Sequence, residues 1–245
     1  KPSYKHELIS HFLRIYPKKG LMWLIEAQYI PTVNAIAMGY TYDKATGQRT
    51  FRPDNVNGNW HGQLALGGAG PLTKNRKLDF KAMAGLRYEK SVDLIGLAGT
   101  SAANRSIVES LNYVGDLQLN YRLGQSSIGF ISKGNWAYVD GTREDFEAFN
   151  VSDFNYGLTA QLQLPWDFRL GTDLTMYSRR GYLDKSMNSD DLVWNARLSR
   201  SFFKGQLTLL LDGFDILGQL NNVTRMMNAQ GITETYSNVI PRYVM

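Results

Sequence analysis

The chain has 245 residues and carries 27 Lys and Arg against 22 Asp and Glu, which gives a formal net charge of +5. The charge is spread along the chain without a long basic run, so the sequence predicts no nucleic-acid partner. There is no Cys, which excludes disulfides and thiolate chemistry. No stretch of about eighteen apolar residues occurs, which excludes helical membrane spans.

Alternating apolar and polar residues recur from one end of the chain to the other, in about eleven stretches. This period indicates β-strands with a different environment on each face. Most of the stretches exceed the five or six residues usual in globular domains and reach the roughly nine to eleven that cross a membrane. In chain order, the strands predicted most clearly lie near 6–16, 78–92, 107–123, 126–139, 154–164, 167–181 and 191–203.

The connections between the strands form a short set and a long set that alternate along the chain. Barrels of bacterial outer membranes show this alternation, with short periplasmic turns and long external loops. A soluble sandwich has the same strand period but no reason to keep that order. Short connections are predicted at 17–20, 72–77, 124–125, 165–167 and 204–205, and long loops near 43–57, 93–105, 140–152, 183–190 and 215–231.

The two faces of the predicted strands differ in chemistry. In the strand near 167–181, one face carries Leu170 and Leu174, with Trp166 at its start, as expected for residues in lipid next to an aromatic belt. The opposite faces carry charges that would each cost several kcal/mol in a dry interior unless they were paired. We therefore predict that these charges face a water-filled lumen. The candidate lumen-facing polar residues are Arg87, Glu89, Asp116, Arg122, Arg169, Asp173, Arg179 and Arg197.

These patterns together predict an all-β, antiparallel, up-and-down transmembrane β-barrel segment of about eleven strands. If the turn at 17–20 is periplasmic, the strand before it starts outside the cell, whereas complete bacterial barrels start and end in the periplasm. The last predicted strand, 239–245, is short for a full crossing. We expect residues 1–245 to form one barrel domain that is incomplete at both ends.

Four segments, Thr172–Tyr182, Leu192–Ala196, Leu211–Leu217 and Ile240–Tyr243, resemble the C-terminal barrel segment of the Bacteroidetes outer-membrane β-barrel family, which is akin to TonB-dependent receptors. The resemblance implies a larger barrel of about twenty-two strands in the outer membrane of a Gram-negative bacterium. It also implies the partners: outer-membrane lipid, the remaining barrel strands, an N-terminal plug, TonB acting through a segment absent here, and an unknown extracellular ligand. In that setting the chain would serve nutrient uptake or ligand binding at the cell surface.

Two other functions fit the same strand pattern. A structural or adhesive outer-membrane barrel would bind a partner through its loops without transport. A soluble β-protein that binds a ligand in a cleft would show the same alternation, although the order of long and short connections argues against it.

The sequence carries no pattern that indicates catalysis or a cofactor. The only three His, His6, His11 and His61, lack the spacing of metal ligands. Ser10 and His11 are adjacent in a predicted strand and therefore lie on opposite faces, so they cannot act as nucleophile and base. We expect no enzyme activity, no catalytic residue, no bound metal and no cofactor.

Two further stretches invite a ligand interpretation. The glycine-rich stretch 67–70 lacks the spacing and the Lys of a phosphate-binding loop, and it predicts a strand end or a tight bend instead. The acidic loop at 140–147 offers carboxylates that could hold Ca²⁺. An ordinary solvated loop would have the same composition, so the sequence leaves both interpretations of this loop open.

Overall fold

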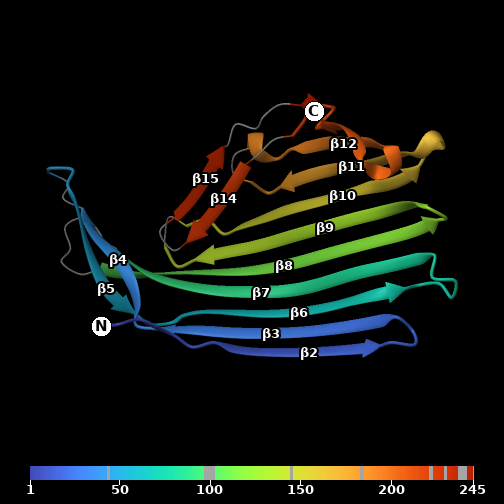
Figure 1. Ribbon diagram of the computed structural model, residues 1–245. Helices are drawn as coiled ribbons and strands as arrows, with labels where there is room; N and C mark the ends of the chain where they lie inside the picture. Colours follow the sequence, from blue (N-terminus) through green and yellow to red (C-terminus); the bar gives the residue numbers. More distant parts are fainter. Residues whose placement is uncertain are drawn as a thin grey trace.

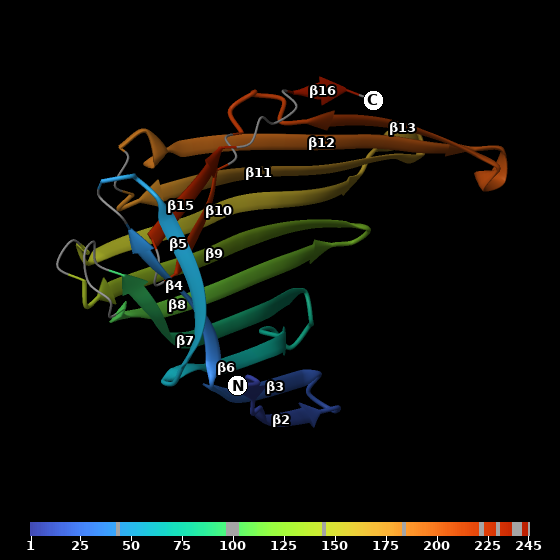
Figure 2. The ribbon, with the colours of Figure 1, turned by 90° about the vertical axis from the view of Figure 1, so that its left-hand side faces the viewer.

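The alternating strands form one antiparallel sheet that curves into an open trough (Figures 1 and 2). The computed structural model describes residues 1–42, 45–96, 103–143, 146–182, 185–220, 223–228, 231–236 and 242–244. These residues form strands and three 3-10 turns but no α-helix, which confirms the predicted all-β antiparallel class. None of their helices is long and apolar enough to cross a membrane.

The main sheet contains 12 strands in the order β1-β3-β6-β7-β8-β9-β10-β11-β12-β13-β16, with β2 also paired to β3. Because β1 and β2 pair with the same edge of β3, the 12 strands occupy eleven rows, in agreement with the prediction. The strands are β1 (Tyr4–Lys5), β2 (Leu8–Tyr16), β3 (Leu21–Val33), β4 (Ala35–Tyr42), β5 (Arg49–Val56), β6 (Asn59–Pro71), β7 (Leu78–Gly96), β8 (Ala103–Leu123), β9 (Ser126–Gly141), β10 (Phe149–Gln163), β11 (Phe168–Arg180), β12 (Asp190–Phe202), β13 (Leu207–Phe214), β14 (Val223–Asn228), β15 (Gly231–Tyr236) and β16 (Tyr243–Val244).

All five short connections predicted from the sequence lie at one end of the sheet, which we call the short-turn end. The opposite end is the long-loop end. Two predicted loops, 43–57 and 215–231, were wrong in part, because the chain forms the β4–β5 and β14–β15 hairpins there, each a separate two-stranded sheet. The predicted loops 93–105, 140–152 and 183–190 lie partly outside the described residues.

Large apolar side chains lie exposed along one face of the sheet, which we call the apolar face. Leu66 on β6 is 50% exposed, Leu158 on β10 is 58% exposed and Leu174 on β11 is 41% exposed. A soluble protein rarely exposes so extended an apolar surface. The exposure agrees with strands whose outer face is covered by lipid rather than by a second layer of protein.

Aromatic residues on the apolar face gather at two levels. Towards the long-loop end the rings of Tyr29 and Trp60 lie 5.4 Å apart, and those of Trp60 and Tyr88 lie 4.6 Å apart. Towards the short-turn end the rings of Trp23 and Phe80 lie 6.2 Å apart. The eight residue steps from Phe80 to Tyr88 along β7 span about 20 Å at a tilt of about 40°, which is comparable with the apolar band of about 25 Å in membrane barrels.

β7 and β8 are 19 and 21 residues long, so they extend well beyond this band at the long-loop end. The β4–β5 hairpin packs against their extensions. Ala37 on β4 and Val56 on β5 are buried together with Val92 on β7, and Leu94 and Ile107 complete the cluster. The hairpin therefore covers apolar side chains that would otherwise meet water above the band.

The predicted bend at 67–70 is confirmed as the end of β6, and its glycines make room for neighbours. A Cβ on Gly68 would lie 2.5 Å from the Trp23 ring, which occupies that space on the apolar face. Gly70 has a positive φ of 153° beside the turn that joins β2 and β3.

We predict that Gly181→Ala destabilises the long-loop end of β10 and β11. Gly181 follows β11 with a φ of +81°, and a Cβ there would overlap the backbone carbonyl oxygen of Asn150. The strained backbone alone should cost about 1–3 kcal/mol. The measurement is the free energy of unfolding by urea of the complete protein folded into lipid vesicles. The control is Gly115→Ala, because nothing lies within 4 Å of that position; equal stability of the two variants would contradict the prediction.

Candidate functional site

The strand register places all eight predicted lumen residues on the same face of the sheet, opposite the apolar face. Residues directly opposite each other in an antiparallel pair share a face, and the unbroken register from β6 to β13 extends this face across the sheet. We call it the polar face. That it lines a lumen stays a prediction. The eight residues are Arg87, Glu89, Asp116, Arg122, Arg169, Asp173, Arg179 and Arg197.

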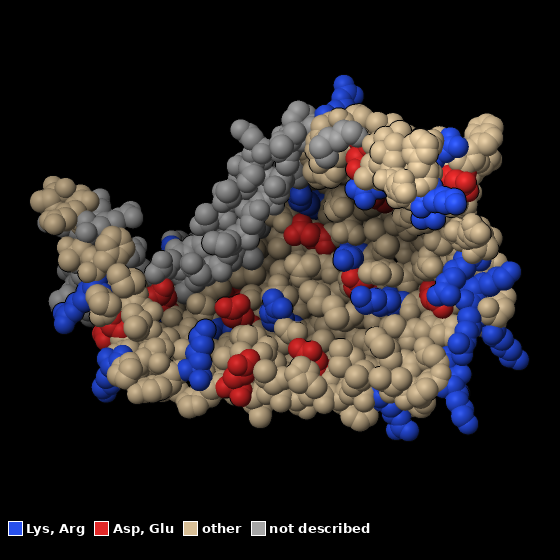
Figure 3. All heavy atoms as spheres, viewed as in Figure 1, with Lys and Arg blue, Asp and Glu red and all other residues tan. Residues whose placement is uncertain are grey.

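The polar face lies on the concave side of the trough. Figure 3 shows acidic and basic side chains distributed over this side, between the long-loop end and the short-turn end. Both signs of charge are interspersed, so the face presents many fixed hydrogen-bond donors and acceptors rather than one strong potential.

Ion pairs to neighbouring strands hold four of the eight residues in place. Arg197 on β12 binds Asp212 on β13 through two contacts, Nε to Oδ1 at 2.5 Å and a second nitrogen to Oδ2 at 3.1 Å. Lys133 on β9 lies 3.2 Å from the carboxylate of Asp116 on β8. A two-contact guanidinium–carboxylate pair fixes both side chains in one orientation. The polar face is therefore preorganised rather than a layer of mobile charges.

Two other predicted residues also bind across strands. Arg122 forms an ion pair with Asp79 on β7. Asp173 accepts a hydrogen bond of 2.9 Å from the side-chain nitrogen of Asn195 on β12. Asn195 in turn accepts a bond from the backbone N–H of Asp215, just after β13.

Asp215 is a buried carboxylate, 2% exposed, that sequence reasoning missed. It accepts backbone N–H bonds from Gln219 at 3.1 Å and Leu220 at 3.0 Å. Together with the bond to Asn195, these contacts fix the start of the long segment between β13 and β16. An Asp that precedes a turn and can bind N–H groups further along the chain is the signal that could have indicated this role.

A hollow on the polar face lies over β10 to β13 and has a volume of about 560 Å³. Three of the predicted residues line it, namely Arg169, Asp173 and Arg197, beside neutral donors and acceptors such as Gln161. Arg169 is exposed and forms no ion pair with a described residue. Its guanidinium is therefore available to a ligand in a way that the Asp212-bound Arg197 is not.

Two further hollows continue along the polar face. One of about 460 Å³ is lined by Asp116 and Arg179, and another of about 380 Å³ by Arg87 and Glu89. Seven of the eight predicted residues thus line one of three hollows, and Arg122 lines none of them. The hollows together are large enough for polar molecules of small to moderate size.

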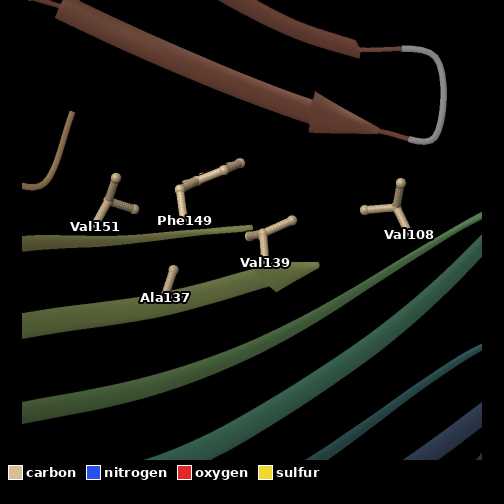
Figure 4. Packing of buried hydrophobic residues seen from close by; sticks show 5 residues of the cluster. All are labelled: Val108, Ala137, Val139, Phe149 and Val151. Atoms are coloured by element: carbon tan, nitrogen blue, oxygen red, sulfur yellow. The ribbon is translucent and has the colours of Figure 1, made fainter. Parts of the chain in front are cut away.

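An apolar cluster interrupts the polar face near the long-loop end. Phe146 and Tyr182 pack against it, and Val139 within it is only 1% exposed. Figure 4 shows its side chains directed from β8, β9 and β10 towards the β14–β15 hairpin, which lies over them. The hairpin folds back over the concave side of the sheet (Figure 1). The five buried members are Val108, Ala137, Val139, Phe149 and Val151.

Two further ion pairs lie on the apolar face, closer to the long-loop end than the ring of Tyr88. Lys90 binds Glu109 at 2.7 Å, and this hydrogen bond lowers the pKa of Glu109. Arg180 donates two hydrogen bonds to Asp190, at 2.8 and 2.7 Å, which lower the pKa of that carboxyl. The lowered pKa favours the charged form of both carboxyl groups where the strands leave the apolar band.

The candidate catalytic and metal-binding residues do not assemble. Ser10 and His11 lie on opposite faces of β2, and the Nδ1 atom of His11 lies 3.4 Å from Glu26 instead. Among the described ranges, no group of three His, Cys, Asp or Glu residues could hold a metal ion. In the acidic loop 140–147, the residues at 144 and 145 lie outside the described residues.

Comparison with known proteins identifies a family. The model of a family described as the outer membrane protein beta-barrel family matches residues 1–245. No curated protein and no solved structure shows a significant match. The match places the sheet in the bacterial outer membrane, so the short-turn end faces the periplasm and the long-loop end faces outwards.

We predict that Val139→Asp releases the β14–β15 hairpin from the sheet. A carboxylate at this buried position would have no partner in the apolar cluster and would cost several kcal/mol unless the hairpin moved away. The expected result is faster trypsin cleavage after Arg225, measured by mass spectrometry on the complete protein in lipid vesicles. Val114→Asp is the matched control, because Val114 lies on the same face but is 38% exposed. Unchanged cleavage in Val139→Asp would contradict the covering role of the hairpin.

Proposed function

Because the chain belongs to the outer membrane protein β-barrel family, we propose that it forms the C-terminal barrel portion of a TonB-dependent-receptor-like protein that takes up an extracellular nutrient. The observation that carries the proposal is the polar face that extends from β6 to β13, with hollows of about 560, 460 and 380 Å³. A barrel that served only as a scaffold would not need hollows lined by fixed charges. The resemblance of the C-terminal segments to the Bacteroidetes family supports the same function.

In this proposal a ligand enters from the long-loop end and binds along the polar face. Cross-strand ion pairs such as Arg197–Asp212 keep the donors and acceptors in place, so little side-chain entropy is lost on binding. Arg169 forms no ion pair with a carboxylate among the described residues, so its guanidinium can bind the ligand. The ligand is accordingly a polar molecule that accepts hydrogen bonds.

The proposal requires additional strands, because the sheet cannot close on itself. β2 runs towards the short-turn end, and β16, which follows the long segment after β13, runs in the same direction. Pairing β2 with β16 would therefore be parallel, whereas membrane barrels of bacteria are antiparallel. The remaining strands and an N-terminal plug of the parent protein would complete the barrel, and TonB would act on that plug.

An adhesive or structural barrel without transport is the alternative. Both functions are non-enzymatic, with no catalytic residue, metal or cofactor, and both exclude a nucleic-acid partner. The outer-membrane location argues against the third function that the sequence left open, a soluble β-protein that binds a ligand. Transport differs from adhesion because it removes a compound from the medium.

We predict that cells lacking the gene leave in the medium a polar compound that wild-type cells consume. The measurement is untargeted mass spectrometry of the spent medium, which detects the compound whatever its identity. Arg169→Gln should slow the removal of that compound by about tenfold, the effect of losing one charged hydrogen bond of about 1.5 kcal/mol.

The matched control is Arg52→Gln, which removes an exposed Arg on β5, away from the polar face. It should consume the compound at the wild-type rate. The same assay without TonB tests energy coupling. Identical media from wild-type and deleted cells would contradict transport and favour the adhesive alternative.

A further inference from the structure

Positive charge is concentrated in one sector of the periplasmic rim. The first two short turns, 17–20 and 72–77, contain five cations and no acidic residue. All five side chains are exposed, and none forms an ion pair with a described residue. We call this set the basic sector; it consists of Lys18, Lys19, Lys74, Arg76 and Lys77.

The two turns lie side by side because β3 and β6 are neighbours in the sheet. Arg76 links them directly, since its guanidinium donates a hydrogen bond of 3.2 Å to the backbone carbonyl of Lys18. In Figure 3 the basic side chains at the lower right project from this end of the sheet, with little acidic surface among them. The charges therefore act as one patch rather than as two separate turns.

Both turns are ordered by their own hydrogen bonds. Gly20 donates its N–H to the carbonyl of Tyr16 at 2.9 Å. In the second turn, the N–H of Arg76 donates to the carbonyl of Thr73 at 3.0 Å, and the Thr73 hydroxyl binds Asn75 at 2.8 Å. The backbone positions that carry the cations are therefore fixed at the rim.

The level of the patch relative to the membrane follows from the aromatic residues next to it. Trp23 and Phe80, in contact on the apolar face, lie a few residues inside the two turns. Arg14 lies over the ring of Tyr16, 5.1 Å from its centroid, where β2 enters the first turn. Aromatic rings and long basic side chains take these positions where hydrocarbon meets headgroups. The basic sector therefore stands at the headgroup level of the periplasmic leaflet.

We propose that the basic sector binds the phosphate headgroups of anionic phospholipids in the periplasmic leaflet of the outer membrane. Five exposed cations at headgroup level complement a negatively charged lipid surface, and each basic side chain near such a surface adds to the attraction. The patch lies next to the aromatic residues at the membrane interface. A lipid would contact both the cations and these rings, whereas free phosphate would contact the cations alone, so the arrangement favours lipid.

The other short turns provide an internal contrast. The turns at 165–167 and 203–206 carry Trp166 and Phe203, which are 78% and 73% exposed, with Asp167 in the first and Lys204 in the second. These turns present aromatic anchors and a balanced charge. Anionic lipid should consequently gather next to β2, β3, β6 and β7 rather than around the whole rim.

The test uses the complete protein in vesicles of equal parts phosphatidylglycerol and phosphatidylethanolamine, followed by native mass spectrometry of the lipids that stay bound. We expect phosphatidylglycerol to be enriched by about tenfold over phosphatidylethanolamine. Replacing Lys18, Lys19, Lys74 and Lys77 by Gln should abolish the enrichment. Arg76 is kept because it links the two turns.

A control variant replaces four exposed cations at the long-loop end, Lys5, Arg52, Lys185 and Arg242, by Gln and should keep the enrichment. Far-UV circular dichroism checks that both variants retain their strands. Equal binding of the two lipids, or enrichment that survives in the first variant, would overturn the proposal. Loss of the enrichment in the presence of inorganic phosphate alone would assign the patch to soluble phosphate and would also overturn it.

Discussion

Every backbone N–H and C=O group inside a bilayer needs a partner within the protein, and this requirement organises the whole sheet. In the main sheet each strand from β3 to β11 is hydrogen-bonded to a neighbour on both sides, so the interior of the sheet meets this requirement along most of its length. The rows at the two ends, β2 on one side and β13 with β16 on the other, do not. No described strand pairs with their outer edges.

The same pairing fixes the chemistry of both faces. Since opposite residues share a face, one choice of register directs Leu158 and Leu174 towards lipid and Asp173 and Arg197 towards the concave side. A slip of one residue in any strand would exchange the two sets. The polar face and the apolar face are therefore two consequences of one constraint.

Alternation and turn spacing sufficed to predict the strands, the short turns and the face of residues such as Arg87 and Arg169. The partners Asp212 and Lys133 were missed, because a residue's cross-strand neighbour depends on a register that one strand does not reveal. The burial of Val139 was also missed, since it depends on a hairpin far along the chain. The β4–β5 and β14–β15 hairpins were predicted as loops. The order of the strands requires a connection at each of these places, but it does not indicate whether that connection is a loop or a hairpin.

The length of β7 and β8 explains why these hairpins are needed. Above the apolar band both faces of a strand meet water, so apolar residues there have to be covered by protein. β4–β5 covers Val92 and Ile107 on one face, and β14–β15 covers Val139 on the other. The second hairpin lies over the concave side of the sheet. The element that covers the apolar cluster therefore also covers part of the polar face near the long-loop end.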